Sequence, residues 1–251
     1  MRHKITLSYV GTAYAGWQRQ PHDPTVQGVL EAALAGVAGQ RVAVTGAGRT
    51  DSGVHASGQV AHFDSAAGLL PAQWRAALNA NLPADVRVLE VTPVSHKFHA
   101  RYSVTGKLYR YCIDNRPLAS PFLAPFAWHL DRRLDVDAMQ AAARLLEGPV
   151  DQRAFATRPQ PGRSQRPLER VQIDADRLLA ITFQGRSFLR YAVRGMVGTL
   201  VQVGTGRRDP ESLAQLAASG DRAAAGPTAP AHGLCLVRVD YGPGEQAVAE
   251  V

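Results

Sequence analysis

The sequence predicts an α+β protein built of two halves, each a β-sheet covered by helices. Short runs in which apolar and polar residues alternate with a period of two indicate strands, and other runs with apolar residues at helical spacing indicate helices. Both kinds of run are mixed along all 251 residues, which is enough chain for one large domain or two modest ones. We therefore expect an N-terminal half at 1–105 and a C-terminal half at 106–251.

In the first half, the strand and helix patterns follow one another closely. Ile5 and Leu7 alternate with polar residues, as in a strand with one buried face, and Thr25 stands where it would cap a helix. The expected strands are 4–10, 42–45, 59–64 and 86–91, and the expected helices are 25–39 and 71–83.

The second half repeats this mixture. Strands are expected at 107–113, 171–174, 178–183 and 233–241, and helices at 135–148, 187–204 and 209–219. Asp209 is expected to cap the last helix, with Pro210 at its first position. In the helix at 187–204, Arg190 and Arg194 are four residues apart and are expected to share one face.

The charge of the chain favours a polyanionic partner such as nucleic acid. Lys and Arg outnumber Asp and Glu by 28 to 21, for a net charge of +7, and only three of the 28 are lysines. Arginine suits bidentate phosphate contacts better than lysine does. Five arginines in the Pro-rich stretch 153–170 predict a basic loop that could clamp an RNA backbone. Two isolated cysteines and the lack of a long apolar run favour a cytoplasmic protein.

The stretch GAGRTDSGVHASGQVAHF, residues 46–63, holds the densest set of candidate functional residues. It lacks the lysine of a phosphate-binding P-loop, and Asp51 stands where a dinucleotide fingerprint requires its third glycine. A metal site formed by His55, His62 and Asp64 remains an alternative, and so does an ordinary turn. A fourth interpretation is a loop that presents the Asp51 carboxylate beside the Arg49 guanidinium, which would keep the carboxylate ionised and nucleophilic.

Several stretches resemble one known family. GAGRTDSGVHASGQVAHF is similar to the signature of the tRNA pseudouridine synthase A family, and so are YVGTAYAGWQRQ, NANLP, FHARYSVTGKLYRYCI, FLRYAVRGMVG and APAHGLCLVRVDY. The resemblance implies two α+β halves whose antiparallel sheets join into one extended, mostly antiparallel sheet, flanked by helices and with a central cleft. It implies an isomerase that converts uridine to pseudouridine in the anticodon stem-loop of tRNA, at positions 38, 39 and 40.

The resemblance also implies roles for particular residues. Asp51 is the expected nucleophile and Arg49 its electrostatic partner, Tyr109 is expected to stack on the target base, and Arg194 is expected to pair with Asp51 or with a phosphate. No metal and no cofactor are expected, and the family's members act as homodimers.

The chain departs from the family pattern at Ala154, where an aspartate is typical, and at Ala192 and Gly195, where methionine and asparagine are typical. A glycine inside a helix costs ~1 kcal/mol relative to alanine, so the contacts around Arg194 are expected to differ from the family's. Two other functions stay open from the sequence: an RNA-binding protein without catalysis, and a metal-dependent hydrolase that uses His55, His62 and Asp64.

Overall fold

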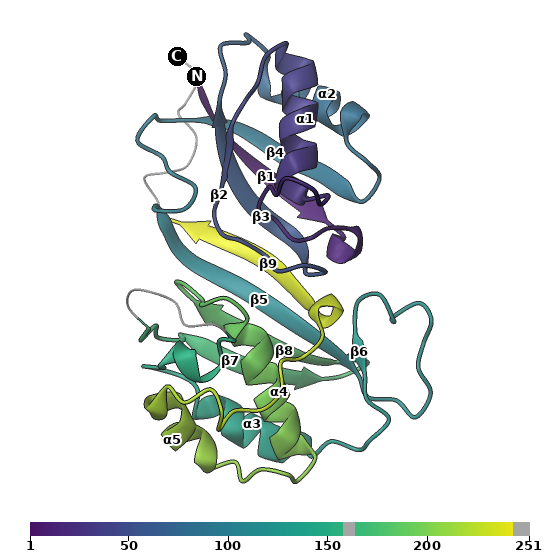
Figure 1. Ribbon diagram of the computed structural model, residues 1–251, viewed down its shortest axis with the longest axis vertical. Helices are drawn as coiled ribbons and strands as arrows, with labels where there is room; N and C mark the ends of the chain where they lie inside the picture. Colours follow the sequence, from purple (N-terminus) through teal and green to yellow (C-terminus); the bar gives the residue numbers. More distant parts are fainter. Residues whose placement is uncertain (158–163, 243–251) are drawn as a thin grey trace. The chain divides into compact units, whose positions relative to one another are not determined.

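The computed structural model describes residues 1–157 and 164–242, which form two compact units. The first unit contains Met1–Thr105 and, from the C-terminal region, residues 236–242; the second is Gly106–Cys235. Both combine helices with strands that pair mainly in antiparallel fashion (Figure 1). The predicted α+β class with a mostly antiparallel sheet flanked by helices is confirmed.

In the first unit, strands β4 (Val86–Val94), β1 (Arg2–Tyr9), β3 (His55–Asp64) and β9 (Leu234–Tyr241) follow one another in the sheet in that order. The short β2 (Val44–Gly46) pairs with β3. The predicted alternation of β1 is confirmed, because Ile5 and Leu7 are fully buried. Ile5 lies between Ala61 of β3 and Val91 of β4.

Helices α1 (Val26–Ala38) and α2 (Pro71–Asn81) cover this sheet (Figure 1). Leu30, Leu34, Trp74 and Leu78 form their buried faces. The predicted cap of α1 is confirmed, since the Thr25 hydroxyl accepts a hydrogen bond from the backbone N–H of Gly28 at 3.2 Å. A 3-10 turn, η1 (Gly11–Ala13), follows β1.

The second unit is built on strands β5 (Val104–Asp114), β8 (Leu179–Gly185) and β7 (Arg170–Ala175), with β6 (Trp128–His129) pairing with β5. Its helices are α3 (Val136–Arg144), α4 (Ala192–Gly204) and α5 (Ser212–Ser219). Two 3-10 turns complete it, η2 (Gln152–Ala154) and η3 (Ala231–Gly233). Asp135 caps α3 by accepting from the Ala138 N–H at 2.9 Å.

Helix α4 begins five residues later than the sequence predicts. Tyr191 has a φ of 67°, in the left-handed region, and it precedes the first helical residue, Ala192. The prediction that Arg190 and Arg194 share a helix face is therefore wrong, because Arg190 lies outside the helix. Helix α3 ends at Arg144 and α5 begins at Ser212, so both are also shorter than predicted.

The C-terminal strand differs from the sequence prediction, and the arginine-rich stretch lies partly outside the described residues. The C-terminal strand, which the sequence analysis assigns to the second half, belongs to the first unit from Leu236 onward, where Ser57 of β3 donates a hydrogen bond to the Val237 carbonyl. Residues 158–163 of the arginine-rich stretch lie outside the described residues. Of the helices that the structure describes, none is both long and apolar enough to cross a bilayer.

Candidate active site

The Asp51 loop, residues 46–54, connects β2 to β3 in the first unit. Asp51 is half-buried, Arg49 is exposed, and Thr50 between them is buried. The backbone N–H of Val54 donates to the Asp51 carbonyl at 3.1 Å and closes a turn around Asp51. Of the loop's three glycines, only Gly53 has a positive φ, 78°. The buried Thr50 and the Val54 turn fix the backbone on both sides of the carboxylate.

The segment between β1 and α1 holds this loop from one side. The backbone N–H of Trp17 donates to the Thr50 carbonyl at 3.1 Å, and the backbone N–H of Gly53 donates to the Tyr14 carbonyl at 3.3 Å. Gly16, with a φ of 97°, lies so close that a β-carbon there would be 2.6 Å from the Thr50 carbonyl oxygen. Only glycine allows this approach, so the stretch YVGTAYAGWQRQ helps to position Asp51.

Two buried polar side chains hold the loop from the sheet side. The Tyr9 hydroxyl and the Thr50 hydroxyl lie 2.9 Å apart and share a hydrogen bond. The Gln59 side chain, fully buried, donates to the Gly48 carbonyl at 3.0 Å and to the Tyr9 hydroxyl at 3.3 Å. Neither Tyr9 nor Gln59 is among the residues predicted from the sequence. A signal was present, because a glutamine inside a buried strand needs polar partners.

Arg49 has a defined partner in the same unit. Its Nε donates to the Gln18 side-chain oxygen at 3.1 Å, and Gln18 in turn donates to Gln27 of α1 at 2.7 Å. The guanidinium is thus fixed to the segment that holds the loop. Its electrostatic effect on Asp51 stays a prediction.

The three residues of the alternative metal site serve other purposes. The ring Nδ1 of His55 accepts from the Gly11 N–H at 3.0 Å, and that of His62 accepts from the Ala100 N–H at 3.1 Å. Asp64 forms a bidentate pair with Arg2, which lowers the pKa of this carboxyl. Burial, with a contribution from the Arg2 charge, lowers the pKa of His62 to about 4. Within 1–157 and 164–242, no group of three or more His, Cys, Asp or Glu residues is placed to hold a metal ion.

In the second unit, Tyr109 lies on the face of β5 that also carries Tyr111 and Ile113. It is buried, pairs with Phe183 of β8 in the sheet register, and packs edge-to-face against Phe188 at a ring-centroid distance of 5.1 Å. Tyr111 and Ile113 are also buried on this face, as the period of the strand predicts.

Arg194 lies in the first turn of α4 and is half-buried. Its Nε donates to the Ala229 carbonyl at 2.7 Å, and its guanidinium carbon lies 5.3 Å from the centre of the Tyr191 ring. Burial raises the pKa of the Tyr111 hydroxyl, and the positive charge of Arg194 partly opposes this. Arg194 therefore lies near the same face of β5 as Tyr109.

Tyr191 is a residue that the sequence analysis missed. Arg190 also lies over its ring, at 4.8 Å, and donates to its hydroxyl at 3.0 Å. A left-handed non-glycine residue is strained, and such residues concentrate at functional sites. The two arginines converge on one ring instead of repelling one another along a helix.

Two of the positions that depart from the family pattern, Ala154 and Gly195, lie close together, because Gly195 contacts the residue that follows Ala154. A β-carbon at Gly195 would overlap the carbonyl oxygen of Phe155, the neighbour of the fully buried Ala154. Because α4 starts at Ala192, Gly195 lies in its first turn and not at its middle. The missing side chain at Gly195 therefore lets α4 lie close to the end of η2.

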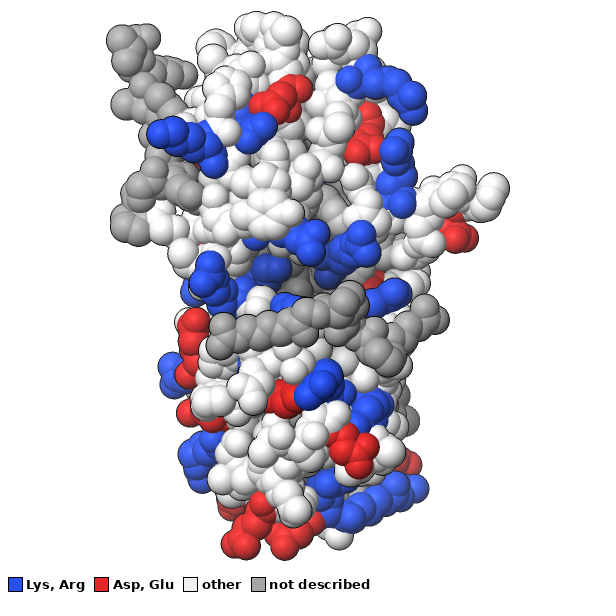
Figure 2. Space-filling model, turned by 60° about the vertical axis from the view of Figure 1, so that its left-hand side comes forward, with Lys and Arg blue, Asp and Glu red and all other residues white. Residues whose placement is uncertain are grey.

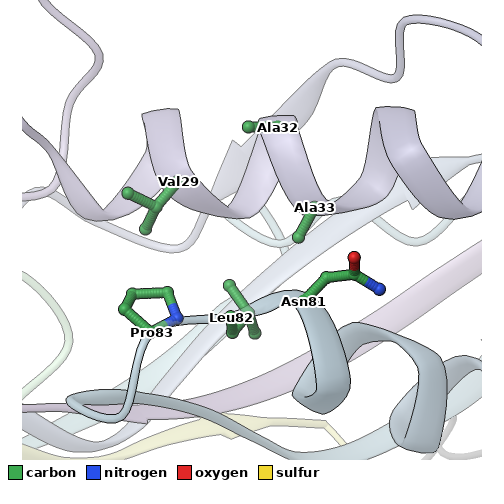
Figure 3. A pocket seen from close by; sticks show the side chains of 6 residues that line it. All are labelled: Val29, Ala32, Ala33, Asn81, Leu82 and Pro83. Atoms are coloured by element: carbon green, nitrogen blue, oxygen red, sulfur yellow. The ribbon is translucent and has the colours of Figure 1, made fainter.

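A shallow hollow of about 590 Å³ lies between α1 and the end of α2 (Figure 3). Its lining consists of Val29, Ala32, Ala33, Asn81, Leu82 and Pro83, so it offers an uncharged surface. On the side that Figure 2 shows, Lys and Arg side chains lie on both units, with Asp and Glu side chains among them. None of the predicted site residues, Arg49, Asp51, Tyr109 and Arg194, lines this hollow.

Comparison with known proteins identifies the family. A family model described as tRNA pseudouridine synthase matches residues 5–103 and 142–242. Proteins named tRNA pseudouridine synthase A are 46% identical in Syntrophotalea carbinolica (96% of this chain, 96% of that protein) and 45% identical in Moorella thermoacetica (95% and 98%). The protein of that name from Myxococcus xanthus is 44% identical over 98% of this chain and 94% of its own length. The matched residues include the Asp51 loop, Arg194 and most of both units, and the chain belongs to the tRNA pseudouridine synthase family.

Proposed function

We propose that this protein isomerises uridine to pseudouridine in the anticodon stem-loop of tRNA, at positions 38, 39 and 40. The main support is the Asp51 loop, in which backbone and side-chain hydrogen bonds from three segments position one half-buried carboxylate. The names of the relatives support tRNA as the substrate.

The reaction requires a nucleophile that is held in position next to the substrate. The bond between the base nitrogen and the sugar breaks, the uracil turns, and a new bond forms through carbon 5, which loses its proton to solvent. Asp51 supplies the carboxylate for a transient adduct with the nucleotide. Because the loop is already hydrogen-bonded in place, little ordering is needed when the substrate arrives.

Tyr109, Arg194 and Arg49 are proposed to bind the substrate or to stabilise charge during the reaction. Tyr109 supplies an aromatic ring for the extruded uracil, and base stacking of this kind is worth ~1–3 kcal/mol, which offsets part of the cost of flipping the nucleotide out. Arg194 offers a guanidinium to an anion, either a carboxylate or a phosphate. Arg49 adds positive charge beside Asp51.

The test is the release of tritium from unmodified tRNA whose uridines carry tritium on carbon 5. We expect the wild-type protein to release tritium and Asp51→Ala to release none while it still binds tRNA. Asp176→Ala, in the exposed turn between β7 and β8, serves as the matched control and should behave as wild type. Sites of pseudouridine mapped in the product should be 38, 39 and 40.

Three outcomes would count against the proposal. If wild-type protein binds tRNA without releasing tritium, the protein is an RNA-binding protein without this catalysis. If a chelator abolishes the release, or Asp51→Ala leaves it undiminished, the nucleophile is not Asp51 and a metal-dependent reaction has to be considered.

We propose further that the protein acts as a homodimer in the cytoplasm. Leu118 and Phe122, in the loop between β5 and β6, are 83% and 87% exposed. This loop is nevertheless held by hydrogen bonds, because Asp114 accepts from Arg116 and from the Ser120 N–H. Large apolar side chains on an ordered loop are typical of a protein interface.

A further inference from the structure

The turn that joins β4 to β5 exposes an aromatic ring to solvent. We call residues 95–103 the Tyr102 turn. Tyr102 is 73% exposed, more than any other Phe, Trp or Tyr side chain of the first unit among the described residues. An exposed aromatic ring in a folded protein suggests a contact with a ligand.

The ring of Tyr102 is held in place from one side. It lies over the ring of His99, with centroids 4.2 Å apart and planes inclined by 30°. The Nδ1 atom of His99 accepts from the N–H groups of Arg101 and Tyr102, at 3.2 and 3.3 Å, which fixes the imidazole. Backbone and side-chain bonds between His99 and Ser103 close the turn. Tyr102 is thus pre-oriented, and a ligand would lose little of its binding energy to ordering the ring.

The turn is also attached firmly to the sheet of the first unit. His62 of β3 packs edge-on against His99 at 4.9 Å and accepts from the Ala100 N–H. Arg2 of β1 donates to the Phe98 carbonyl at 2.8 Å, and the Tyr241 hydroxyl of β9 donates to the Ala100 carbonyl at 2.7 Å. Three strands therefore support the turn.

The charge of the turn indicates the class of ligand. The sequence SHKFHARYS has no acidic residue, and its His96, Lys97 and Arg101 are exposed. The guanidinium carbon of Arg101 lies 6.0 Å from the centre of the Tyr102 ring. A fixed aromatic ring beside a guanidinium, in a turn that also carries Lys97, fits a group that is both aromatic and anionic, and a nucleotide of single-stranded RNA is such a group.

We propose that the Tyr102 turn is a second RNA-binding site, in which an unpaired base stacks on Tyr102 and Arg101 or Lys97 contacts the neighbouring phosphate. This rests on the proposed function, since it assumes that the RNA is a tRNA. The site is separate from Asp51. His55 and His62 stand seven residues apart on β3, about 23 Å at the usual rise of a strand, and Asp51 precedes the His55 end. The stacked base is therefore not the target uridine.

The experiment measures the affinity of the full-length protein for an unmodified tRNA transcript at several salt concentrations. Tyr102→Ala should weaken binding by about 5- to 150-fold, the usual value of one base stack, without changing the slope of log affinity against log salt. Tyr102→Phe should bind as wild type because it keeps the ring. Arg101→Ala should lower the slope by about 0.7–0.9, as expected for one lost phosphate contact.

Leu70→Ala is the matched control, because Leu70 is an exposed apolar residue of the same unit, at 61%. Melting temperatures should be equal in all variants, since Tyr102 is largely solvent-exposed. Wild-type affinity in Tyr102→Ala would overturn the proposal, and so would a weakened Tyr102→Phe. A lower sedimentation mass of Tyr102→Ala at unchanged tRNA affinity would assign the turn to contacts between protein chains instead.

Failure of this inference can be told apart from failure of the proposed function. If Tyr102→Ala binds tRNA as wild type while wild-type protein still releases tritium, the second site is wrong and the isomerase function stands. If wild-type protein releases no tritium but Tyr102→Ala still loses tRNA affinity, the RNA site stands without the isomerase.

Discussion

At the scale of single residues, the position of the Asp51 carboxylate depends on a neighbour that carries no side chain. Gly16 adopts a φ of 97° and lies directly against the Thr50 carbonyl and the Asp51 backbone. Any β-carbon there has to push the loop away. A shift of about 1 Å in a catalytic group costs on the order of 10²-fold in rate, so this glycine is predicted to matter for catalysis.

We predict that Gly16→Ala lowers tritium release by about 10²-fold and destabilises the protein by about 1–3 kcal/mol. Gly39→Ala is the matched control, because Gly39 also has a positive φ, 68°, but faces open space after the end of α1. That variant should lose a similar amount of stability and keep its activity. Equal activity of the two variants, in assays at saturating tRNA, would show that the Gly16 contact does not position Asp51.

At the scale of secondary-structure elements, His3 lies where β1, β3 and α2 meet. Its ring stacks on Phe63 at 5.1 Å and lies 5.8 Å from Trp74, and it is 1% exposed. Neither ring nitrogen has a hydrogen-bond partner among the described residues. Burial lowers the pKa of His3, so the folded state holds this ring neutral.

This packing gives a prediction for the pH dependence of stability. The pKa values of both His3 and His62 are lowered in the folded protein, to about 4 for His62, so the unfolded chain takes up protons first as the pH falls. The free energy of unfolding should thus be highest above the ordinary histidine pKa of about 6.5 and should fall between pH 6.5 and about 4. Urea titrations at several pH values across this range measure how the free energy of unfolding changes with pH.

Two substitutions in these strands test the cause. His3→Leu removes a ring without partners, so we expect equal or higher stability, by up to about 1 kcal/mol, and a shallower pH slope. His62→Leu also removes a titrating ring but leaves the Ala100 N–H without its acceptor, and it should cost about 1–3 kcal/mol. A large loss of stability in His3→Leu at pH 7.5 would contradict this interpretation.

At the scale of the whole molecule, the positive charge should dominate the affinity for RNA. The chain carries a net charge of +7, and its arginines lie in both units. Each phosphate contact releases a counterion from the nucleic acid, so the affinity should fall steeply with salt.

We predict that raising the salt concentration from 50 to 200 mM weakens the binding of tRNA to the wild-type protein by about 10³-fold or more, as for a protein with six or more phosphate contacts. Filter binding of a labelled transcript measures this. Asp176→Ala is the control: it has one acidic charge fewer, and its tRNA affinity should fall with salt at the same slope as that of the wild type. A change smaller than tenfold would mean that contacts with bases, and not with phosphates, supply most of the affinity.

Local patterns were enough to predict much of the chain. The period of β1, the Thr25 cap of α1, the buried face of Tyr109 and Tyr111 and the family signature around Asp51 are all properties of short stretches. Such features depend on neighbours within a few residues, so they can be predicted from the sequence alone. The α+β class followed from them.

Other features needed the tertiary structure because they depend on residues far apart in the chain. Helix α4 starts only after Tyr191, whose φ of 67° interrupts the helical pattern of residues 187–204 and whose ring contacts Arg190 and Arg194. Gly16 contacts Thr50, Asp51 and Ser52, which lie 34 to 36 residues further along the chain. Gln59 donates to the carbonyl of Gly48, 11 residues before it. The family and its candidate carboxylate can be recognised without a structure. What holds that carboxylate in place depends on the three-dimensional packing, since these hydrogen bonds and close backbone contacts form only once the strands have come together.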